Sequence, residues 1–168
     1  MRSRSLPGVD FHDPGQVITA LNKRFQMADQ SEKFFTGWYG VYDVHDRRIA
    51  YAGGGHPPAL LMTGPTAAEA ELVRLESTGP MIGAFDEQEF NSETVEVGRH
   101  GTLYLYSDGV FEVQLKNGQM WEFEEFVAFM GRRRQIAESA IQQLIEHTQA
   151  LSGQDHWNDD FSIIEIRF

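Results

Sequence analysis

The 168-residue sequence contains no cysteine and no long apolar run. Without cysteine there can be no disulfide, no thiolate metal site and no cysteine nucleophile. No apolar run reaches the roughly 18 residues that are needed to span a bilayer. Residues 1–7 also lack the apolar core of a signal peptide. We therefore expect a cytoplasmic protein without a membrane partner.

Basic residues are also scarce, since 14 lysines and arginines stand against 25 aspartates and glutamates, for a net charge of −11. An acidic chain of this kind is poorly suited to a nucleic-acid partner. The one dense basic run, at residues 132–134, lies between two expected helices and is short enough to be simply solvated. Nucleic acid is therefore not an expected ligand.

The remaining composition is that of an ordinary globular chain. Hydrophobic residues make up 41% of the sequence and charged residues 23%. A chain of 168 residues fits one domain and can bury a sizeable core. A single domain over residues 1–168 is therefore expected.

A helix is predicted to begin at Pro14. Asp13 stands at the capping position, proline suits the first helical turn, and Gln16 completes a capping box. Apolar residues follow at helical spacing and form one stripe: Val17, Ile18, Leu21, Phe25 and Ala28. We expect this helix to end at about residue 27 or 28, before a polar loop at residues 29–33.

The middle of the chain reads as strands, and the last third as two helices and a strand. Strands are expected at residues 34–42, 48–52, 59–62, 71–75, 90–97, 102–106 and 161–168. The first two form a hairpin around a polar turn, and residues 63–70 an exposed hairpin tip. Helices are expected at residues 121–130, closed by Gly131, and 136–151, closed by Gly153. This order indicates an α+β layered domain with antiparallel sheets.

Two acidic steps adjoin strands that lie far apart in the sequence. An aromatic, apolar run from residue 102 to 106 breaks at Ser107, Asp108 and Gly109. Asp159 and Asp160 stand just before the last strand. A carboxylate at a strand end is held rigidly from behind and faces whatever lies ahead. We therefore expect the fold to bring Asp108 and Asp159 together.

Paired strand-end carboxylates suit a hard divalent cation. Mg²⁺ and Mn²⁺ prefer oxygen ligands and need few protein carboxylates, and such ions lower the pKa of a bound water to near neutrality. The alternative is that Asp108 sits in a Ser-Asp-Gly turn for backbone reasons and that Asp159 ends a loop. Spacing alone leaves both interpretations open.

Several motifs, taken in order, resemble one enzyme family. They are Tyr104-Leu105-Tyr106-Ser107-Asp108-Gly109-Val110 with Glu112, Asn158-Asp159-Asp160-Phe161-Ser162, Gly55-His56-Pro57-Pro58-Ala59-Leu60-Leu61 and Gly79-Pro80-Met81-Ile82-Gly83. Their order and spacing are similar to those of the metal-dependent protein serine/threonine phosphatases, the protein phosphatase 2C-like proteins. The match is nearest to the bacterial stage II sporulation protein E-type branch and covers nearly the whole chain.

This resemblance implies an αββα sandwich of two mainly antiparallel sheets flanked by helices. It also implies a binuclear Mn²⁺ or Mg²⁺ site, whose bridging water attacks the phosphorus of phosphoserine or phosphothreonine without a phosphoenzyme. Carried over, Asp108 and Asp159 are the catalytic residues and ligate one metal. Asp160 is a neighbouring or alternative ligand, and Gly109 lets the backbone turn close to the metal.

One motif of the family has no counterpart here. The family places an Asp-containing, Gly-His-Gly-type loop before its first matched helix, and the Asp of that loop bridges the two metals. Asp10 and Asp13 lie near His12, but no Gly-His-Gly follows. The resemblance therefore implies a domain truncated at its N-terminus, with an incomplete metal pair and doubtful activity as an isolated segment.

The same comparison suggests partners and an alternative function. The expected partners are a phosphorylated regulatory protein of the anti-sigma-factor antagonist type and an N-terminal sensory or receiver module in a parent chain. A strand exposed by the missing segment would favour a homodimer. The alternative is a catalytically inactive, phosphatase-like interaction module of a signalling regulator.

Two other groups of polar residues are candidates of lower standing. His56, before two prolines, could act as a general acid, although a loop histidine paired with backbone groups is the expected case. Asp43, His45 and Asp46 could form a metal cluster, but as solvated residues of a hairpin turn they need no special role, and this interpretation is preferred.

Overall fold

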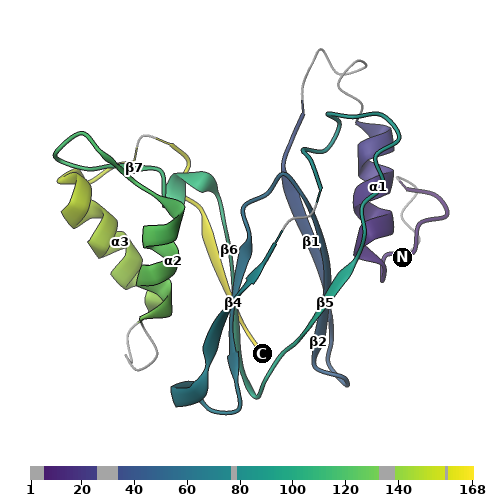
Figure 1. Ribbon diagram of the computed structural model, residues 1–168, viewed down its shortest axis with the longest axis horizontal. Helices are drawn as coiled ribbons and strands as arrows, with labels where there is room; N and C mark the ends of the chain where they lie inside the picture. Colours follow the sequence, from purple (N-terminus) through teal and green to yellow (C-terminus); the bar gives the residue numbers. More distant parts are fainter. Residues whose placement is uncertain (1–5, 26–33, 77–78, 133–138, 158) are drawn as a thin grey trace. The chain divides into compact units, whose positions relative to one another are not determined.

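The computed structural model describes residues 6–25, 34–76, 79–132, 139–157 and 159–168. It divides into two compact units (Figure 1). The first unit is formed by Met1–Pro58 and Glu76–Val97, and the second by Ala59–Leu75 and Gly98–Phe168. No helix within the described ranges is long and apolar enough to cross a membrane.

The first unit is built on a three-stranded antiparallel sheet in the order β1-β2-β5. Its strands are β1 (Gly37–Asp43), β2 (Arg48–Gly54) and β5 (Glu93–Glu96). The predicted hairpin is confirmed, with Gly37 opposite Gly54. At its turn, the Asp43 carboxylate accepts hydrogen bonds from the backbone N–H groups of His45 and Asp46, at 2.8 and 3.0 Å. Those bonds, Asp46 first, lower the pKa of Asp43, so its role is local to the turn.

Helix α1 (Pro14–Arg24) packs against β1 and β2 and buries Val17 and Ile18. The predicted cap is confirmed, because the Asp13 carboxylate accepts from the N–H groups at helix positions 15 and 16. The predicted end at residue 27 or 28 is wrong. Phe25 leaves the helical conformation (φ −118°, ψ 53°), and its ring lies edge-on to Phe35 at 5.5 Å. The predicted loop at residues 29–33 lies outside the described residues.

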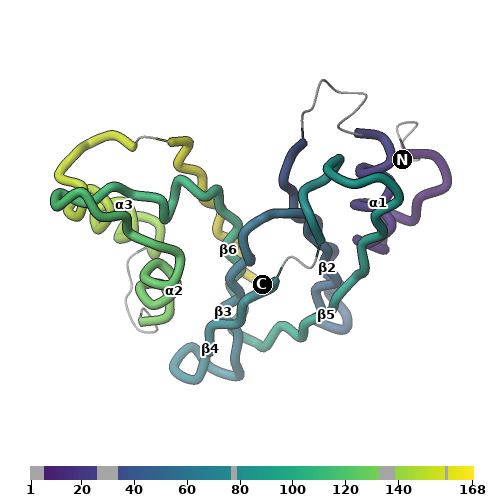
Figure 2. Tube along the Cα trace, turned by 45° about the horizontal axis from the view of Figure 1, so that its top comes forward, coloured from purple at the N-terminus to yellow at the C-terminus, as the bar shows by residue number. Residues whose placement is uncertain are grey.

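The second unit contains a four-stranded antiparallel sheet in the order β4-β3-β6-β9 (Figure 2). Its strands are β3 (Ala59–Gly64), β4 (Glu71–Leu75), β6 (His100–Tyr106) and β9 (Ile163–Arg167). The expected exposed tip at residues 63–70 is only partly correct. Strand β3 extends to Gly64, a 3₁₀ turn η2 (Ala67–Glu69) follows, and Ala70 is buried.

Helices α2 (Phe123–Gly131) and α3 (Ala140–Ser152) contribute to the core of the second unit, together with one face of its sheet. The ring of Phe126 is fully buried and lies 4.7 Å from that of Tyr106 at the end of β6. Large aromatic contacts of this kind dominate the energetics of a core. They hold the end of β6 rigidly against α2.

The predicted helix start at Trp121 is wrong. Trp121 belongs to β8 (Met120–Trp121), which pairs with β7 (Val113–Gln114) across a tight turn. Gly118 in that turn has a φ of 84°, which suits glycine, and follows Asn117, a residue that also favours turns. For α3, the predicted start at residue 136 lies outside the described residues. Its end at Gly153, with φ 71°, is confirmed.

The α+β class and the mainly antiparallel sheets are thus confirmed. In the first unit α1 packs on its sheet, and in the second α2 and α3 share a core with theirs. The last pair of the β6–β9 ladder places Tyr106 opposite Ile163. That pair marks the edge at which both acidic steps lie.

Candidate functional site

Strand β6 ends, and strand β9 begins, at the same edge of the second sheet. The strands are antiparallel, with Tyr106 opposite Ile163 as the terminal pair. Asp108 follows this pair by two residues, and Asp159 precedes it by four. The two acidic turns therefore leave the sheet side by side, as the sequence pattern suggested.

The side chain of Ser107 ties these turns together. Its hydroxyl donates a hydrogen bond to the carbonyl oxygen of Asp160 at 2.5 Å and accepts one from the N–H of Ser162 at 3.0 Å. Its own N–H donates to the carbonyl of Ser162 at 3.0 Å. Sequence reasoning missed this role, because the only signal was a serine in front of Asp-Gly.

Gly109 lies where the backbones of the two turns approach each other closely. A Cβ atom at this position would lie 2.6 Å from the carbonyl oxygen of Asp160 and 3.3 Å from the carbonyl carbon of Asp159. The first distance is shorter than real Cβ contacts allow. Only glycine permits this approach of backbone to backbone, so Gly109 sets the separation of the two turns.

Asp108 is anchored through its main chain, whereas its carboxylate is exposed. It opens a 3₁₀ turn, η3 (Asp108–Val110), and its carbonyl accepts from the N–H groups of Phe111 and Glu112 at 2.9 Å each. Val110 in this turn is fully buried. The turn is thus fixed from the core side while the carboxylate faces solvent.

The Asp108 and Asp159 carboxylates have local hydrogen-bond partners. Oδ1 of Asp108 accepts from the N–H of Gly109 at 3.1 Å, and Oδ1 of Asp159 from the N–H of Asp160 at 2.7 Å. Each carboxylate has a second oxygen and further lone pairs available. Both groups, and that of Asp160, are exposed at this edge.

The chemistry of these donors fits a hard divalent cation such as Mg²⁺ or Mn²⁺, which carboxylate oxygens bind. Their number is small. Within the described ranges, no three histidine, aspartate or glutamate side chains gather closely enough to hold a metal ion. The turns at Asp108 and Asp159 can thus supply part of a ligand set.

The other acidic and histidine candidates have structural partners. Asp13 accepts a 2.5 Å hydrogen bond from the Ser92 hydroxyl, which is the main cause of its lowered pKa. The Asp10 carboxylate accepts from the N–H of His12 at 2.9 Å. Nδ1 of His56, which is half-buried, lies 2.6 Å from the carbonyl of Pro57. These contacts favour local roles for all three candidates.

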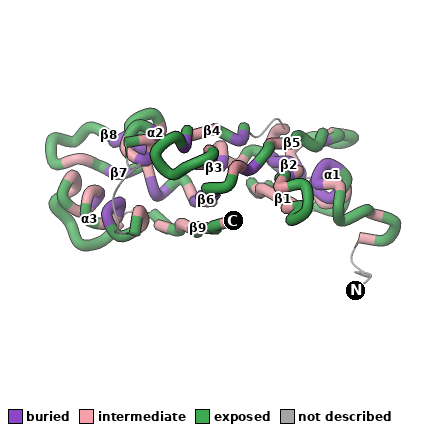
Figure 3. Tube along the Cα trace, turned by 90° about the horizontal axis from the view of Figure 1, so that it is seen from below, coloured by how far each residue is buried: buried purple, intermediate pink, exposed green. Residues whose placement is uncertain are grey.

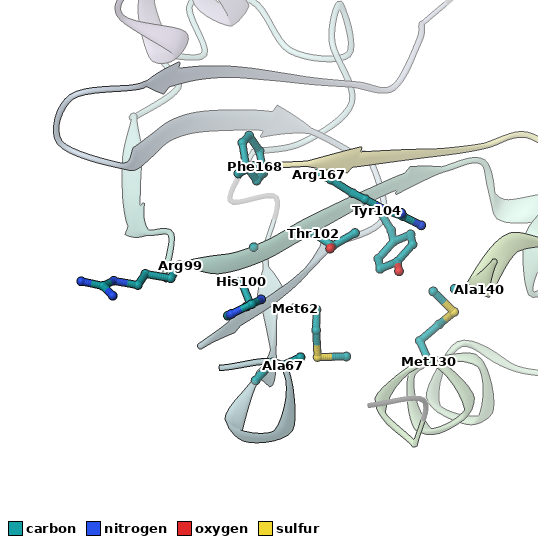
Figure 4. Close-up of a pocket in the computed structure, with 12 residues that line it drawn as sticks. Met62, Ala67, Arg99, His100, Thr102, Tyr104, Met130, Ala140, Arg167 and Phe168 are labelled. Atoms are coloured by element: carbon teal, nitrogen blue, oxygen red, sulfur yellow. The ribbon is translucent and has the colours of Figure 1, made fainter. Parts of the chain in front are cut away.

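A pocket of about 310 Å³ lies toward the other end of the same sheet (Figure 4). Its walls come from β3, β6, β9, η2, α2 and α3, and no carboxylate is among the described residues that line it. Tyr104, within the pocket, has a raised pKa because it is buried and because Glu165 is near. The pocket thus lacks the ligands that the acidic edge provides.

Comparison with known proteins points to one family. The model of the family described as "Stage II sporulation protein E (SpoIIE)" matches residues 3–168. The chain is 34% identical to the phosphoserine phosphatase RsbP of Bacillus subtilis over 92 residues, which are 55% of this chain and 22% of RsbP. It is 25% identical to the phosphoserine phosphatase RsbU of the same organism over 169 residues, which cover 97% of this chain and 47% of RsbU.

Solved structures show the same fold. The PP2C domain of SiaA from Pseudomonas aeruginosa matches with a TM-score of 0.74 at 18% identity, over 94% of this chain and 60% of that one. RsbX in complex with magnesium matches with a TM-score of 0.57 at 10% identity, over 90% of this chain and 62% of that one. The chain spans less than half the length of the two phosphoserine phosphatases.

Proposed function

The chain belongs to the stage II sporulation protein E family of protein phosphatase 2C-like domains, and from this we propose that it carries one half of a metal-dependent phosphoprotein phosphatase site. The reaction is the hydrolysis of phosphoserine or phosphothreonine. The observation that carries the proposal is the contact between the two acidic turns, made by Ser107 and Gly109. These contacts join two turns whose aspartates, Asp108 and Asp159, lie 51 residues apart in the sequence.

Each residue at this edge has a proposed role. Asp108 and Asp159 hold a Mn²⁺ or Mg²⁺ ion through their carboxylates, with the main chain at Gly109 and the side chain of Asp160 as neighbouring donors. Such an ion, when bound, supplies Lewis acidity and a water nucleophile near neutral pH. Ser107 is a positioning residue, because it fixes the second turn relative to the first and touches no metal ligand atom.

The proposed substrate is a phosphorylated regulatory protein of the anti-sigma-factor antagonist type. The support for this is the likeness to two phosphoserine phosphatases, RsbP and RsbU. Because the chain covers 22% and 47% of those proteins, we place the remaining ligands and an N-terminal sensory or receiver module in a longer parent protein.

The second candidate function is that of an inactive, phosphatase-like interaction module. It is favoured by one feature of the sequence, the lack of a Gly-His-Gly loop after Asp10 and Asp13. In that case the acidic edge binds a partner protein, holds no Mn²⁺ between Asp108 and Asp159, and releases no phosphate.

Phosphate release and metal binding together separate these functions. The chain is incubated with a phosphoserine peptide with and without Mn²⁺, and Mn²⁺ affinity is measured by calorimetry. Asp108→Asn and Asp159→Asn are the test variants. Asp155→Asn is the matched control, because Asp155 is an exposed aspartate of the same segment whose side chain pairs with His156.

The half-site proposal predicts Mn²⁺ binding that both test variants weaken and the control preserves. Mn²⁺-dependent phosphate release with the same pattern would establish the enzyme in this chain itself. Mn²⁺ binding without release fits a half site that the parent protein completes. Binding that is indifferent to both test variants, or no Mn²⁺ binding at all, would contradict the proposal and favour the interaction module.

A further inference from the structure

Strand β9 forms one edge of the four-stranded sheet. It pairs with β6 on one side, and no described strand pairs with it on the other. Its residues are intermediate or exposed along its whole length (Figure 3). Ile164 and Ile166 are 59% and 38% exposed. An open edge with apolar side chains is a template for pairing with another strand.

The two faces of β9 differ in chemistry. Glu165 and Arg167 share one face with Ile163, the first residue of the strand, and form an ion pair at 2.6 Å. Ile164, Ile166 and Phe168 alternate with them and belong to the other face. Figure 4 shows Arg167 extending along the pocket toward Tyr104, while the ring of Phe168 lies on the opposite side of the chain from the Arg167 side chain. Any strand that pairs with β9 must match a charged face and an apolar face at once.

The sequence of β9 matches itself in the antiparallel direction. Directly opposite residues of an antiparallel pair share a face. If Ile166 lies opposite Ile166 of a second copy, each Glu165 lies opposite an Arg167 on the charged face. On the apolar face, each Ile164 then lies opposite a Phe168.

Neighbouring registers are less favourable. A slip of one residue would place apolar side chains on the charged face. The next register that keeps the faces aligned places Glu165 opposite Glu165, and like charges directly opposite are destabilising. Only the register with Ile166 opposite Ile166 places Glu165 opposite Arg167, so the charge pattern of β9 favours this register.

We propose that a second copy of this chain pairs antiparallel with β9 along its open edge, with Ile166 on the two-fold axis. Two four-stranded sheets then join into one continuous sheet. This interface is independent of the phosphatase proposal, since it uses neither acidic turn. It also specifies the strand through which the homodimer suggested by the sequence would form.

Single cysteines test the register directly, because the chain has no cysteine of its own. Residues opposite each other have Cα atoms about 5 Å apart, within the roughly 7 Å that a disulfide needs. Ile166→Cys is therefore expected to form a cross-linked dimer under mild oxidation. Ile164→Cys is the matched control, because its two copies would lie ~13 Å apart along the strands and should stay unlinked.

Charge reversal provides a second test. Arg167→Glu and Glu165→Arg each place like charges opposite one another, and each is expected to weaken self-association by about tenfold. Mixed together, the two variants restore opposite charges at both pairs, so their mixture should associate as wild type does. Analytical ultracentrifugation of each variant and of the mixture measures this, and recovery on mixing shows that neither variant is misfolded.

Several outcomes would overturn the proposal. Equal cross-linking of both cysteine variants would exclude the register. A dimer that tolerates both charge reversals would place the interface elsewhere. A wild-type chain that stays monomeric, with Ile166→Cys unlinked, would mean that another segment covers the edge or that it stays open.

Discussion

Gly109→Ala is expected to separate the two acidic turns. The added Cβ would lie 2.6 Å from the Asp160 carbonyl oxygen and 3.0 Å from its carbonyl carbon. Carbon–oxygen contacts in proteins settle at about 3.3 Å or more, so one turn must move by roughly 0.7 Å. The Asp160 carbonyl cannot move freely, because the Ser107 hydroxyl holds it at 2.5 Å.

Gly109→Ala is expected to lower both the stability of the chain and the function of the acidic edge. Forcing an extra methyl group into a packed contact costs roughly 1–3 kcal/mol of unfolding free energy. A shift approaching 1 Å at a catalytic group can lower activity by about 100-fold. Chemical denaturation measures the loss of unfolding free energy. Mn²⁺ calorimetry detects the displacement of Asp108 from Asp159, which is expected to lower the affinity for Mn²⁺.

The matched control is Gly131→Ala, at the end of α2. Its Cβ would meet only the Leu72 side chain, at an ordinary 3.7 Å. This variant should keep wild-type Mn²⁺ affinity and lose no stability. If Gly109→Ala were as stable as wild type and bound Mn²⁺ equally well, the contact between the two turns would not be what positions the carboxylates.

Three further predictions concern the same framework. Ser107→Ala removes both hydrogen bonds that the Ser107 hydroxyl makes to the second turn, and it should lower the free energy of unfolding by about 1–2 kcal/mol. Hydrogen-exchange measurements should then show faster exchange of the Ser162 amide. Phe126→Ala leaves a cavity in the core that packs against β6, and it should lower the free energy of unfolding in denaturant by roughly 3–5 kcal/mol. A smaller loss would show that Phe126 is not central to this core. Asp13 has a pKa below its ordinary 3.8, so its contribution to stability is present above about pH 4 and disappears as pH falls through the lowered pKa. Ser92→Ala should raise this pKa, as followed by carboxyl NMR titration, and an unchanged value would remove Ser92 as the cause.

The acidic edge could be predicted from the sequence because its signals are local. An apolar strand that breaks at Asp108 and a second strand that begins after Asp159 each leave a clear pattern. Antiparallel pairing of the two strands then makes their meeting possible. The hydrogen bonds of the Ser107 hydroxyl and the close approach of the two backbones at Gly109 could not be predicted. Both depend on a contact between segments that lie about 50 residues apart in the sequence.

The errors in the fold also have physical causes. Phe25 fits the apolar stripe of α1, but its ring packs on Phe35, and this tertiary contact accompanies the end of the helix. Trp121 fits a helical pattern, yet the turn at Asn117 and Gly118 returns it to a two-residue strand. Strands as short as β7 and β8 leave too little periodicity to be recognised.

The order of strands in a sheet is another property that local patterns do not carry. The alternation of Ile164, Glu165, Ile166 and Arg167 predicts a strand but does not say whether it is central or at an edge. The structure shows that β9 pairs with β6 and with no second described strand, which identifies β9 as an edge strand that is open to pairing.

The central claim is that Asp108 and Asp159 together bind a divalent cation. Paramagnetic broadening by Mn²⁺ in ¹H–¹⁵N NMR spectra tests it most directly, because the effect is confined to the surroundings of the ion. We predict that substoichiometric Mn²⁺ broadens the amide signals of residues 107–109 and 159–162 first, and that Asp108→Asn and Asp159→Asn each abolish this effect. Broadening centred on the Asp43 turn instead, or broadening at the acidic edge that survives both substitutions, would contradict the claim.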